Sequence, residues 1–274
     1  MKISIVTISY NQSKYLELCL RSVIEQDQIN KEYIVVDPGS TDGSREIIEK
    51  YKNYINKIIF ETDKGPADGL NKGFSHATGD IYGFLNSDDL LLPGALKSVE
   101  LAFSEMPRID VVSGHAFVID QNGERISKLY SRKYSLFRYV YGAATIAQQS
   151  TFFRSLAFKK TNGFNVQNRV YWDGELFFDL AMSGAQFAVL NKLLACFRIY
   201  GNSITGSQRL RDAAYQNNLR LFTQLYGREW KRRDLLTHYY AKILEYSQQP
   251  WILFERLRNG PTIPRKYRSN RWPG

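Results

Sequence analysis

Two adjacent carboxylates, Asp88 and Asp89, come two residues after an apolar run at residues 81–85 that has the length of one buried strand. Two neighbouring negative charges repel each other unless a cation lies beside them. At the carboxyl end of a strand in an α/β sheet, such a pair points into the crevice where ligands bind. The pair therefore indicates a divalent cation that has oxygen ligands and itself binds a phosphate. The alternative is a solvated turn.

The segments before this pair predict the sheet that positions it. Apolar and β-branched runs predict strands at residues 2–9, 33–36, 58–60 and 81–85, with helical spacing of apolar residues between them. Strands that alternate with helices over about 90 residues are typical of βαβ units and a parallel sheet. Polar residues follow each strand, namely Thr7 and Tyr10, Asp37, Asp63, and the Asp88-Asp89 pair. We expect them to meet at one edge of the sheet, where a nucleotide would bind.

Two further carboxylates, Asp173 and Glu175, precede a run of apolar residues at helical spacing. Carboxylates at a helix start are stabilised by the positive end of the helix dipole. They could therefore be catalytic groups or simply N-terminal capping residues. Between the two carboxylate pairs, residues 120–123 (DQNG) predict a hairpin turn. Residues 130–146 lack periodicity and could form a substrate-covering loop or a plain surface connection.

Composition limits the class of protein. The chain has 274 residues, of which 43% are hydrophobic and 23% charged, as in an ordinary globular protein. Cys19 and Cys196 lie in apolar segments and are predicted to be buried thiols in a reducing compartment. No signal peptide and no 18-residue apolar run is evident, so we expect a cytoplasmic protein without a transmembrane helix. Neither a Gly-x-Gly-x-x-Gly fingerprint nor a P-loop is present.

The net charge of +10 favours anionic partners such as nucleotide phosphates or lipid headgroups. Nucleic acid is the least supported, because no zinc-finger or RNP-type signature occurs. From Trp230 onward, basic residues alternate with Trp, Tyr, Leu and Phe, and Pro261, Pro264 and Pro273 would break any final helix. This tail could pack on the main domain, attach peripherally to an anionic membrane, or mediate oligomerisation.

Five motifs in this order resemble family 2 glycosyltransferases of the GT-A fold. They are residues 6–11 (VTISYN), 35–43 (VVDPGSTDG), 63–73 (DKGPADGLNKG), 77–80 (ATGD) and 86–89 (NSDD). Three later segments resemble the acceptor half of that family, namely residues 149–154 (QSTFFR), 173–176 (DGEL) and 197–201 (FRIYG). The resemblance covers about residues 1–206. It implies a Rossmann-like, mostly parallel sheet flanked by helices, with a nucleotide-binding half at about 1–110 and an acceptor half at about 111–206. Residues 207–274 are then a helical, basic C-terminal extension.

The resemblance implies inverting transfer of a sugar from a nucleotide diphosphate sugar to a hydroxyl of a glycan or lipid-linked glycan in cell-surface polysaccharide synthesis. Mn²⁺ or Mg²⁺ would neutralise the diphosphate leaving group. In the family pattern, Asp89 corresponds to the metal ligand and Asp88 to the residue that contacts the ribose or sugar. UDP is the default nucleotide, and GDP and dTDP remain open.

The same resemblance assigns the other roles. Inverting transfer needs a base that takes the acceptor proton; Asp173 matches that position, with Glu175 as the substitute. The donor-binding residues implied are Thr7 and Tyr10 at the base and ribose, Asp37 at the base imide, and Asp68 and Lys72 beneath the nucleotide and diphosphate.

Two residues depart from the family pattern. Pro38 stands where many members have a second Asp. Tyr200 stands where many have a His that approaches the metal or diphosphate, and a neutral Tyr is a poor metal ligand. Two other functions are considered. A sugar-nucleotide nucleotidyltransferase would need a Gly-rich basic loop after the first strand, and residues 9–12 (SYNQ) do not supply one. A non-catalytic nucleotide-sugar binding module would not need Asp88, Asp89 and Asp173.

Overall fold

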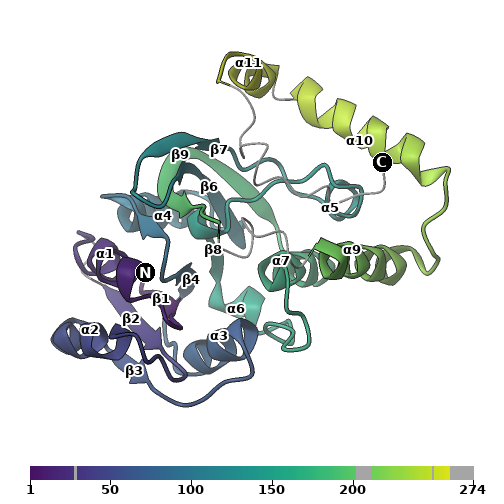
Figure 1. Ribbon diagram of the computed structural model, residues 1–274. Helices are drawn as coiled ribbons and strands as arrows, with labels where there is room; N and C mark the ends of the chain where they lie inside the picture. The colour runs from purple at the N-terminus through teal and green to yellow at the C-terminus, as the bar shows by residue number, and fades with distance from the viewer. Residues whose placement is uncertain (28–29, 202–210, 249, 260–274) are drawn as a thin grey trace.

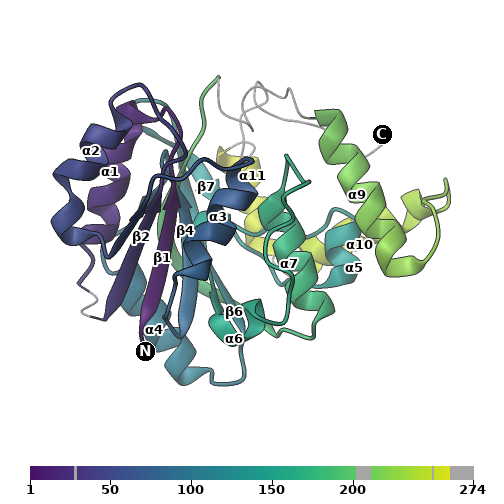
Figure 2. The ribbon, with the colours of Figure 1, turned by 90° about the horizontal axis from the view of Figure 1, so that it is seen from below.

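The computed structural model describes residues 1–27, 30–201, 211–248 and 250–259, and it has an α/β fold (Figure 1). A single curled sheet has the strand order β3-β2-β1-β4-β8-β6-β9-β5, and β7 pairs with β6 outside this path. Helices cover both faces of the sheet (Figure 2). This architecture confirms the fold class expected from the sequence.

The first half contains the predicted parallel strands. They are β1 (Ile3–Ile8), β2 (Lys31–Val36), β3 (Lys57–Ile59) and β4 (Ile81–Asn86). All pairings among these strands are parallel. The intervening helices are α1 (Ser13–Ile24), α2 (Ser44–Lys50), the 3-10 turn η1 (Lys52–Tyr54) and α3 (Pro66–Ser75). The carboxyl ends of the four strands therefore meet at one edge of the sheet.

The second half is a mixed sheet. Its strands are β5 (Leu90–Leu91), β6 (Val111–Ile119), β7 (Arg125–Leu129), β8 (Thr151–Arg154) and β9 (Phe187–Arg198). The helical segments are α4 (Ala95–Glu105), α5 (Leu136–Val140), η2 (Gln148–Ser150), α6 (Ser155–Phe158) and α7 (Trp172–Met182). β8 is antiparallel to β4 and β6, whereas β6 and β9 are parallel. The β6–β7 hairpin at residues 120–123 confirms the predicted turn. The expectation of a mostly parallel sheet holds for the first half.

Two apolar cores lie on opposite faces of the sheet. One lies beneath α1, α2 and α4, and the other beneath α3, α6 and α7. The second core needs glycine at a close approach, because a Cβ at Gly73 of α3 would come within 2.4 Å of Val6 of β1. Burial of apolar side chains on both faces fixes the sheet in place and leaves its carboxyl edge for polar residues.

Three helices follow the sheet, namely α9 (Arg211–Tyr226), α10 (Asp234–Gln248) and α11 (Pro250–Asn259). A third apolar cluster joins α9 and α10 to α5 and α7, through residues that include Phe178, Phe222 and Ala241. The tail therefore packs on the main domain at least through α9 and α10. The expected basic and proline residues beyond 259 lie outside the described residues.

Within the described part of the chain, no helix combines the length and the apolar character needed to cross a membrane.

Candidate active site

The carboxyl edge of the sheet gathers most of the residues that the sequence analysis selected. β1, β2 and β4 run parallel and end at Ile8, Val36 and Asn86. The loops after these strands contain Tyr10, Asp37 and the Asp88-Asp89 pair. The end of β9 reaches the same place, because the backbone N–H of Arg198 donates to a carboxylate oxygen of Asp89 at 2.9 Å.

Asp88 lies half-buried at this edge. Its Oδ2 accepts a hydrogen bond from the Tyr200 hydroxyl at 3.1 Å, and its backbone carbonyl accepts one from Nε of Arg198 at 2.9 Å. Burial raises the pKa of the Asp88 carboxyl, and the Tyr200 hydrogen bond and the Arg198 charge oppose this shift. A bound cation would stabilise the charged form of such a carboxylate, which is partly desolvated and has few fixed hydrogen-bond partners.

Asp89 is fully buried, and both of its carboxylate oxygens are engaged. Oδ1 accepts from the Arg198 backbone, and Oδ2 accepts from the side-chain amide of Gln149 at 3.0 Å. Burial, and then the neighbouring Asp88 charge, raise the pKa of the Asp89 carboxyl well above its usual range. These contacts tie the turn after β4 to β9 and η2. Asp89 is therefore placed to hold the turn, and Asp88 is the more accessible carboxylate of the pair.

The described residues contain no group of three or more His, Cys, Asp or Glu side chains that could hold a metal ion. The single accessible carboxylate of Asp88 fits a hard cation that would take one oxygen ligand from Asp88. Most of its other ligands would come from a bound diphosphate. This arrangement is compatible with Mn²⁺ or Mg²⁺, which accept carboxylate and phosphate oxygens.

Tyr200 links three segments that are far apart in the sequence. Its hydroxyl contacts Asp88 after β4, and it accepts a hydrogen bond from Nε2 of Gln12, just before α1, at 3.1 Å. Its ring also packs against Tyr15 of α1, with 5.3 Å between the ring centroids. Tyr200 thus occupies the expected place beside the carboxylate pair. In this position it acts as a hydrogen-bonding partner of Asp88.

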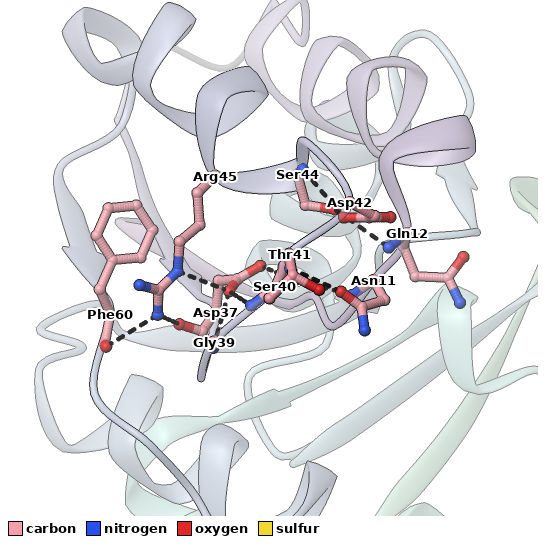
Figure 3. A network of polar contacts seen from close by, with 10 residues as sticks. All are labelled: Asn11, Gln12, Asp37, Gly39, Ser40, Thr41, Asp42, Ser44, Arg45 and Phe60. Carbon is pink, nitrogen blue, oxygen red and sulfur yellow. Dashed lines mark hydrogen bonds and ion pairs between the residues drawn. The ribbon is translucent and has the colours of Figure 1, made fainter.

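Asp37 organises the loop after β2 (Figure 3). It is fully buried, its Oδ1 accepts from the backbone of Gly39 and Ser40, and its Oδ2 accepts from the Ser40 hydroxyl at 2.6 Å. Nε of Arg45 lies 3.1 Å from Oδ1, and Arg45 also donates to the carbonyl of Phe60. The carboxylate that was expected to contact a nucleotide base therefore also fixes its own loop.

The loop after β1 joins this network. Asn11 has a positive φ of 52°, and its side-chain oxygen accepts from the backbone N–H of Thr41 at 2.9 Å. Asp42 accepts from Ser13 and Ser44. Partial burial would raise the pKa of Asp42, but the hydrogen bonds from Ser44 and Ser13 outweigh it and lower the pKa to about 2. Two loops are thus locked together beside the Asp88 site.

Tyr10 and Thr7 have different environments. Tyr10 follows β1 and is largely exposed, so its ring is available for stacking on a base. Thr7 is fully buried, and its hydroxyl pairs with the hydroxyl of Tyr33 at 3.0 Å. Thr7 also lies between β2 and β4, where its register partners are Val35 and Leu85, so the structure gives it a supporting place inside the sheet.

Asp68 and Lys72 lie on α3, and both contact the preceding loop. Asp68 accepts from the backbone N–H of Lys64 at 2.9 Å, at the start of the helix. Lys72 donates to the carbonyl of Thr62 and lies 3.8 Å from the Glu61 carboxylate. In this arrangement Lys72 is a charge partner of the loop.

Asp173 lies in the first turn of α7, which belongs to the acceptor half. Only four residues separate the end of α7 from the amino end of β9. α7 therefore runs back along the sheet, between α3 and α9 in Figure 2, and its first turn lies toward the carboxyl edge. Gly174 allows this helix to approach α5, since a Cβ there would meet the Tyr139 hydroxyl at 2.4 Å. Asp173 is half-buried.

Glu175 is buried and holds the acceptor half together. Its two carboxylate oxygens accept from Asn165 at 2.9 Å and Asn168 at 2.6 Å, and Arg220 of α9 lies 2.6 Å away. One turn further along, burial and then the Glu175 charge raise the pKa of Asp179 to about 6. Of the two base candidates, Asp173 is the more accessible one.

Several residues that support the site were not assigned roles from the sequence. They are Gln12, Arg45, Gln149 and Arg198. Gln149 and Arg198 lie within motifs of the acceptor half. The expectation that these motifs contact the Asp88-Asp89 pair would have identified both residues. Arg45 lies on α2 and carries no sequence signal of its contact with Asp37.

Residues 4–166 match the model of glycosyl transferase family 2, which is more than half of the chain, and the protein belongs to this family. It is 30% identical over 212 residues to an uncharacterized glycosyltransferase of Nostoc sp. PCC 7120, a match that covers 73% of this chain and 66% of that protein. It is 29% identical over 265 residues to the chondroitin synthase of Escherichia coli, covering 94% of this chain and 37% of that protein. The chain thus spans about two thirds or less of these relatives.

Two solved structures share the fold. Residues 1–349 of Staphylococcus aureus TarS in complex with UDP-GlcNAc match with a TM-score of 0.65 and 18% identity, covering 95% of this chain and 78% of that one. The mannosyltransferase PcManGT of Pyrobaculum calidifontis, in complex with GDP-Man and Mn²⁺, matches with a TM-score of 0.63 and 18% identity, covering 94% and 73%. The family and the fold together define the protein as a glycosyltransferase.

Proposed function

We propose that the protein transfers a sugar, with inversion, from a nucleotide diphosphate sugar to a hydroxyl of a glycan or lipid-linked glycan in cell-surface polysaccharide synthesis. The observation that carries this proposal is the position of Asp88 and Asp173 toward one edge of the sheet. Asp88 belongs to the donor half of the chain, and Asp173 belongs to the acceptor half. The named relative that makes chondroitin supports a polysaccharide product. The UDP-sugar and GDP-sugar neighbours support a nucleotide sugar donor, with UDP as the default.

The donor side needs neutralisation of the diphosphate that leaves. A bound Mn²⁺ or Mg²⁺ would supply this positive charge. We assign the contact with the cation to Asp88, because Asp89 uses both of its oxygens within the protein. This reverses the order implied by the family pattern. Tyr200 orients Asp88, the exposed Tyr10 lines the nucleotide side, and Asp37 and Thr7 support the loop and the strand beside it.

The acceptor side needs a base that takes the proton of the attacking hydroxyl. We assign this role to Asp173. Glu175 instead keeps the start of α7 in place through Asn165, Asn168 and Arg220. We place the enzyme in the cytoplasm, at the inner face of the membrane, where lipid-linked acceptors would be presented.

The test is a donor panel with Mn²⁺, with release of nucleoside diphosphate measured in the presence and absence of an acceptor extract. Asp173→Asn should lower transfer by about 10²- to 10⁴-fold while donor binding survives, because only the proton acceptor is lost. Asp212→Asn, in the exposed first turn of α9, is the matched control. Full activity of the Asp173→Asn variant would refute the assignment. Release of pyrophosphate from a nucleoside triphosphate and a sugar phosphate would instead identify a nucleotidyltransferase.

A further inference from the structure

Helix α10 has two opposite faces, and one of them is packed on the main domain. Glu245 forms a buried ion pair with Arg132, and Lys242 donates to the carbonyl of Gly142. Nδ1 of His238 contacts the carbonyl of Tyr141 at 2.7 Å. Asp234 accepts a hydrogen bond from the Tyr141 hydroxyl at 3.1 Å. This face also contains the buried Ala241, and it packs on the segment around α5.

The opposite face of α10 is apolar and exposed. Leu236, Tyr239, Tyr240 and Ile243 follow the spacing i, i+3, i+4 and i+7, so they lie on one side of the helix. On α11, Phe254 and Leu257 are also exposed, and Trp251 is partly exposed while its ring packs on Tyr130, with 4.6 Å between the ring centroids. These seven side chains, which we call the α10–α11 apolar face, are between 41% and 76% exposed.

This concentration is unusual for the molecule. The described residues include fifteen exposed large apolar side chains, and seven of them fall within residues 236–257. Clustered exposed apolar side chains mark an interaction surface, whereas single ones are normal. The arrangement reverses an ordinary surface helix, which buries its apolar side. This apolar face, on a helix that is already anchored by its other side, indicates an interaction surface.

The charge around this face indicates the chemistry of the partner. Residues 207–274 contain 14 Lys and Arg against five Asp and Glu, a surplus of nine in a chain of net charge +10. Lys231, Arg232 and Arg233 are exposed just before α10. The acidic residues of α10, Asp234 and Glu245, are buried on the packed face. Exposed basic residues beside an apolar face with Tyr and Trp fit a surface that is anionic outside and apolar beneath.

We infer that the α10–α11 apolar face binds an anionic lipid surface. The apolar side chains insert among the acyl chains, the Tyr and Trp rings lie at the headgroup level, and the basic residues contact lipid phosphates. The helices lie along the surface. The inference deepens the proposed function, since it names the surface on which the enzyme would meet a lipid-linked acceptor.

The experiment is flotation of the purified protein with lipid vesicles, without donor or acceptor. Binding to phosphatidylcholine vesicles that contain phosphatidylglycerol is expected, with little binding to phosphatidylcholine alone. Added salt should weaken the binding, because salt screens the attraction of exposed charges. Absence of binding to the anionic vesicles, or equal binding to both kinds, would overturn the inference.

A matched pair of variants tests the surface itself. The double change Leu236→Ser and Ile243→Ser should lower vesicle partitioning by about tenfold or more, since two apolar side chains no longer insert. Leu156→Ser, on α6, removes an equally exposed leucine and should have no effect. Unchanged binding of the double variant would refute the assignment. A fall in oligomer mass by light scattering, with vesicle binding intact, would assign the face to a second copy of the chain.

The measurements separate this inference from the proposed function. Donor turnover in solution should be the same in the wild type and in the Leu236→Ser, Ile243→Ser variant, because neither residue lies at the carboxyl edge of the sheet. Vesicle binding without turnover would support the surface and refute the enzyme assignment. Turnover without vesicle binding would support the enzyme assignment and refute the lipid-binding surface.

Discussion

At the scale of single residues, the adjacent Asp88 and Asp89 have different tasks because their surroundings differ. Asp89 accepts hydrogen bonds from the backbone of β9 and from Gln149, and it is closed off from solvent. Asp88 is turned toward Tyr200 and remains partly accessible. The same residue type is therefore engaged in holding the fold at position 89 and remains partly accessible at position 88.

This difference predicts unlike effects of removing each carboxylate. Asp89→Ala would leave the Arg198 N–H and the Gln149 amide without partners, which costs about 1–3 kcal/mol for each buried group. Asp88→Ala should change stability much less but abolish the Mn²⁺ dependence of donor binding. Thermal unfolding and calorimetric titration of donor with and without Mn²⁺ measure the two effects. If Asp89→Ala kept its melting temperature and lost only metal-dependent binding, Asp89 would be the metal ligand after all.

Among the helices, α7 joins the catalytic candidate Asp173 to an acidic pair, Glu175 and Asp179, of which Glu175 is buried and Asp179 half-buried. Glu175 and Asp179 are one helical turn apart, and Arg220 of α9 balances only part of their charge. Like charges at this spacing destabilise a helix. The helix is held in place by its packing against α5 and α9, which offsets this repulsion.

The raised pKa of Asp179 predicts how stability depends on pH. The folded state binds its proton up to about pH 6, whereas the unfolded state releases it near 3.8, so stability falls as the pH rises between these values. The Asp179→Asn variant has no carboxyl group at this position, so it should not lose stability as the pH rises. The variant should be more stable than the wild type by about 1–3 kcal/mol above pH 6, and equally stable below pH 4. Urea unfolding across this range measures it. A constant difference at all pH values would show that the charge of Asp179 is not the cause.

At the scale of the whole molecule, the C-terminal helices clamp the segment around α5. The buried ion pair between Arg132 and Glu245 crosses this contact, and the cluster around Phe222 and Ala241 packs beside it. α5 in turn contacts α7 through Tyr139 and Gly174. The extension therefore supports the helix that contains Asp173, in addition to presenting the α10–α11 apolar face.

Breaking one half of the buried ion pair should be costly. Glu245→Ala would leave the Arg132 charge buried, which destabilises a protein by about 3–5 kcal/mol. The double variant Arg132→Met, Glu245→Leu should lose less stability than Glu245→Ala, because no charge of the pair then stays buried. Glu25→Ala removes the exposed pair with Arg21 and should cost under about 1 kcal/mol. Guanidinium unfolding of the variants compares them. Equal losses for Glu245→Ala and Glu25→Ala would show that the clamp does not stabilise the fold.

The alternation of strands and helices, the parallel first half and the family could all be predicted from the amino-acid sequence. Local patterns contain this information, since apolar periodicity and turn residues act over a few positions. The position of Tyr10, Asp37 and Asp88 at one edge followed from that topology, whereas the place of Asp173 toward the same edge came from the structure. The sequence also determined the basic surplus of the tail, because charge is a sum over residues.

Which member of each acidic pair is accessible could not be predicted from the sequence, because it depends on contacts that the fold creates. Asp89 and Glu175 are engaged by Gln149, Arg198, Asn165, Asn168 and Arg220, all of which come from other elements. The buried hydroxyl of Thr7 and the contact of Lys72 with its own loop are likewise results of packing. The fold also decides which side of α10 is covered, because an amphipathic pattern alone does not specify which face packs on the rest of the protein. Contacts between distant segments have no local signature in the sequence, and the roles of these residues depend on them.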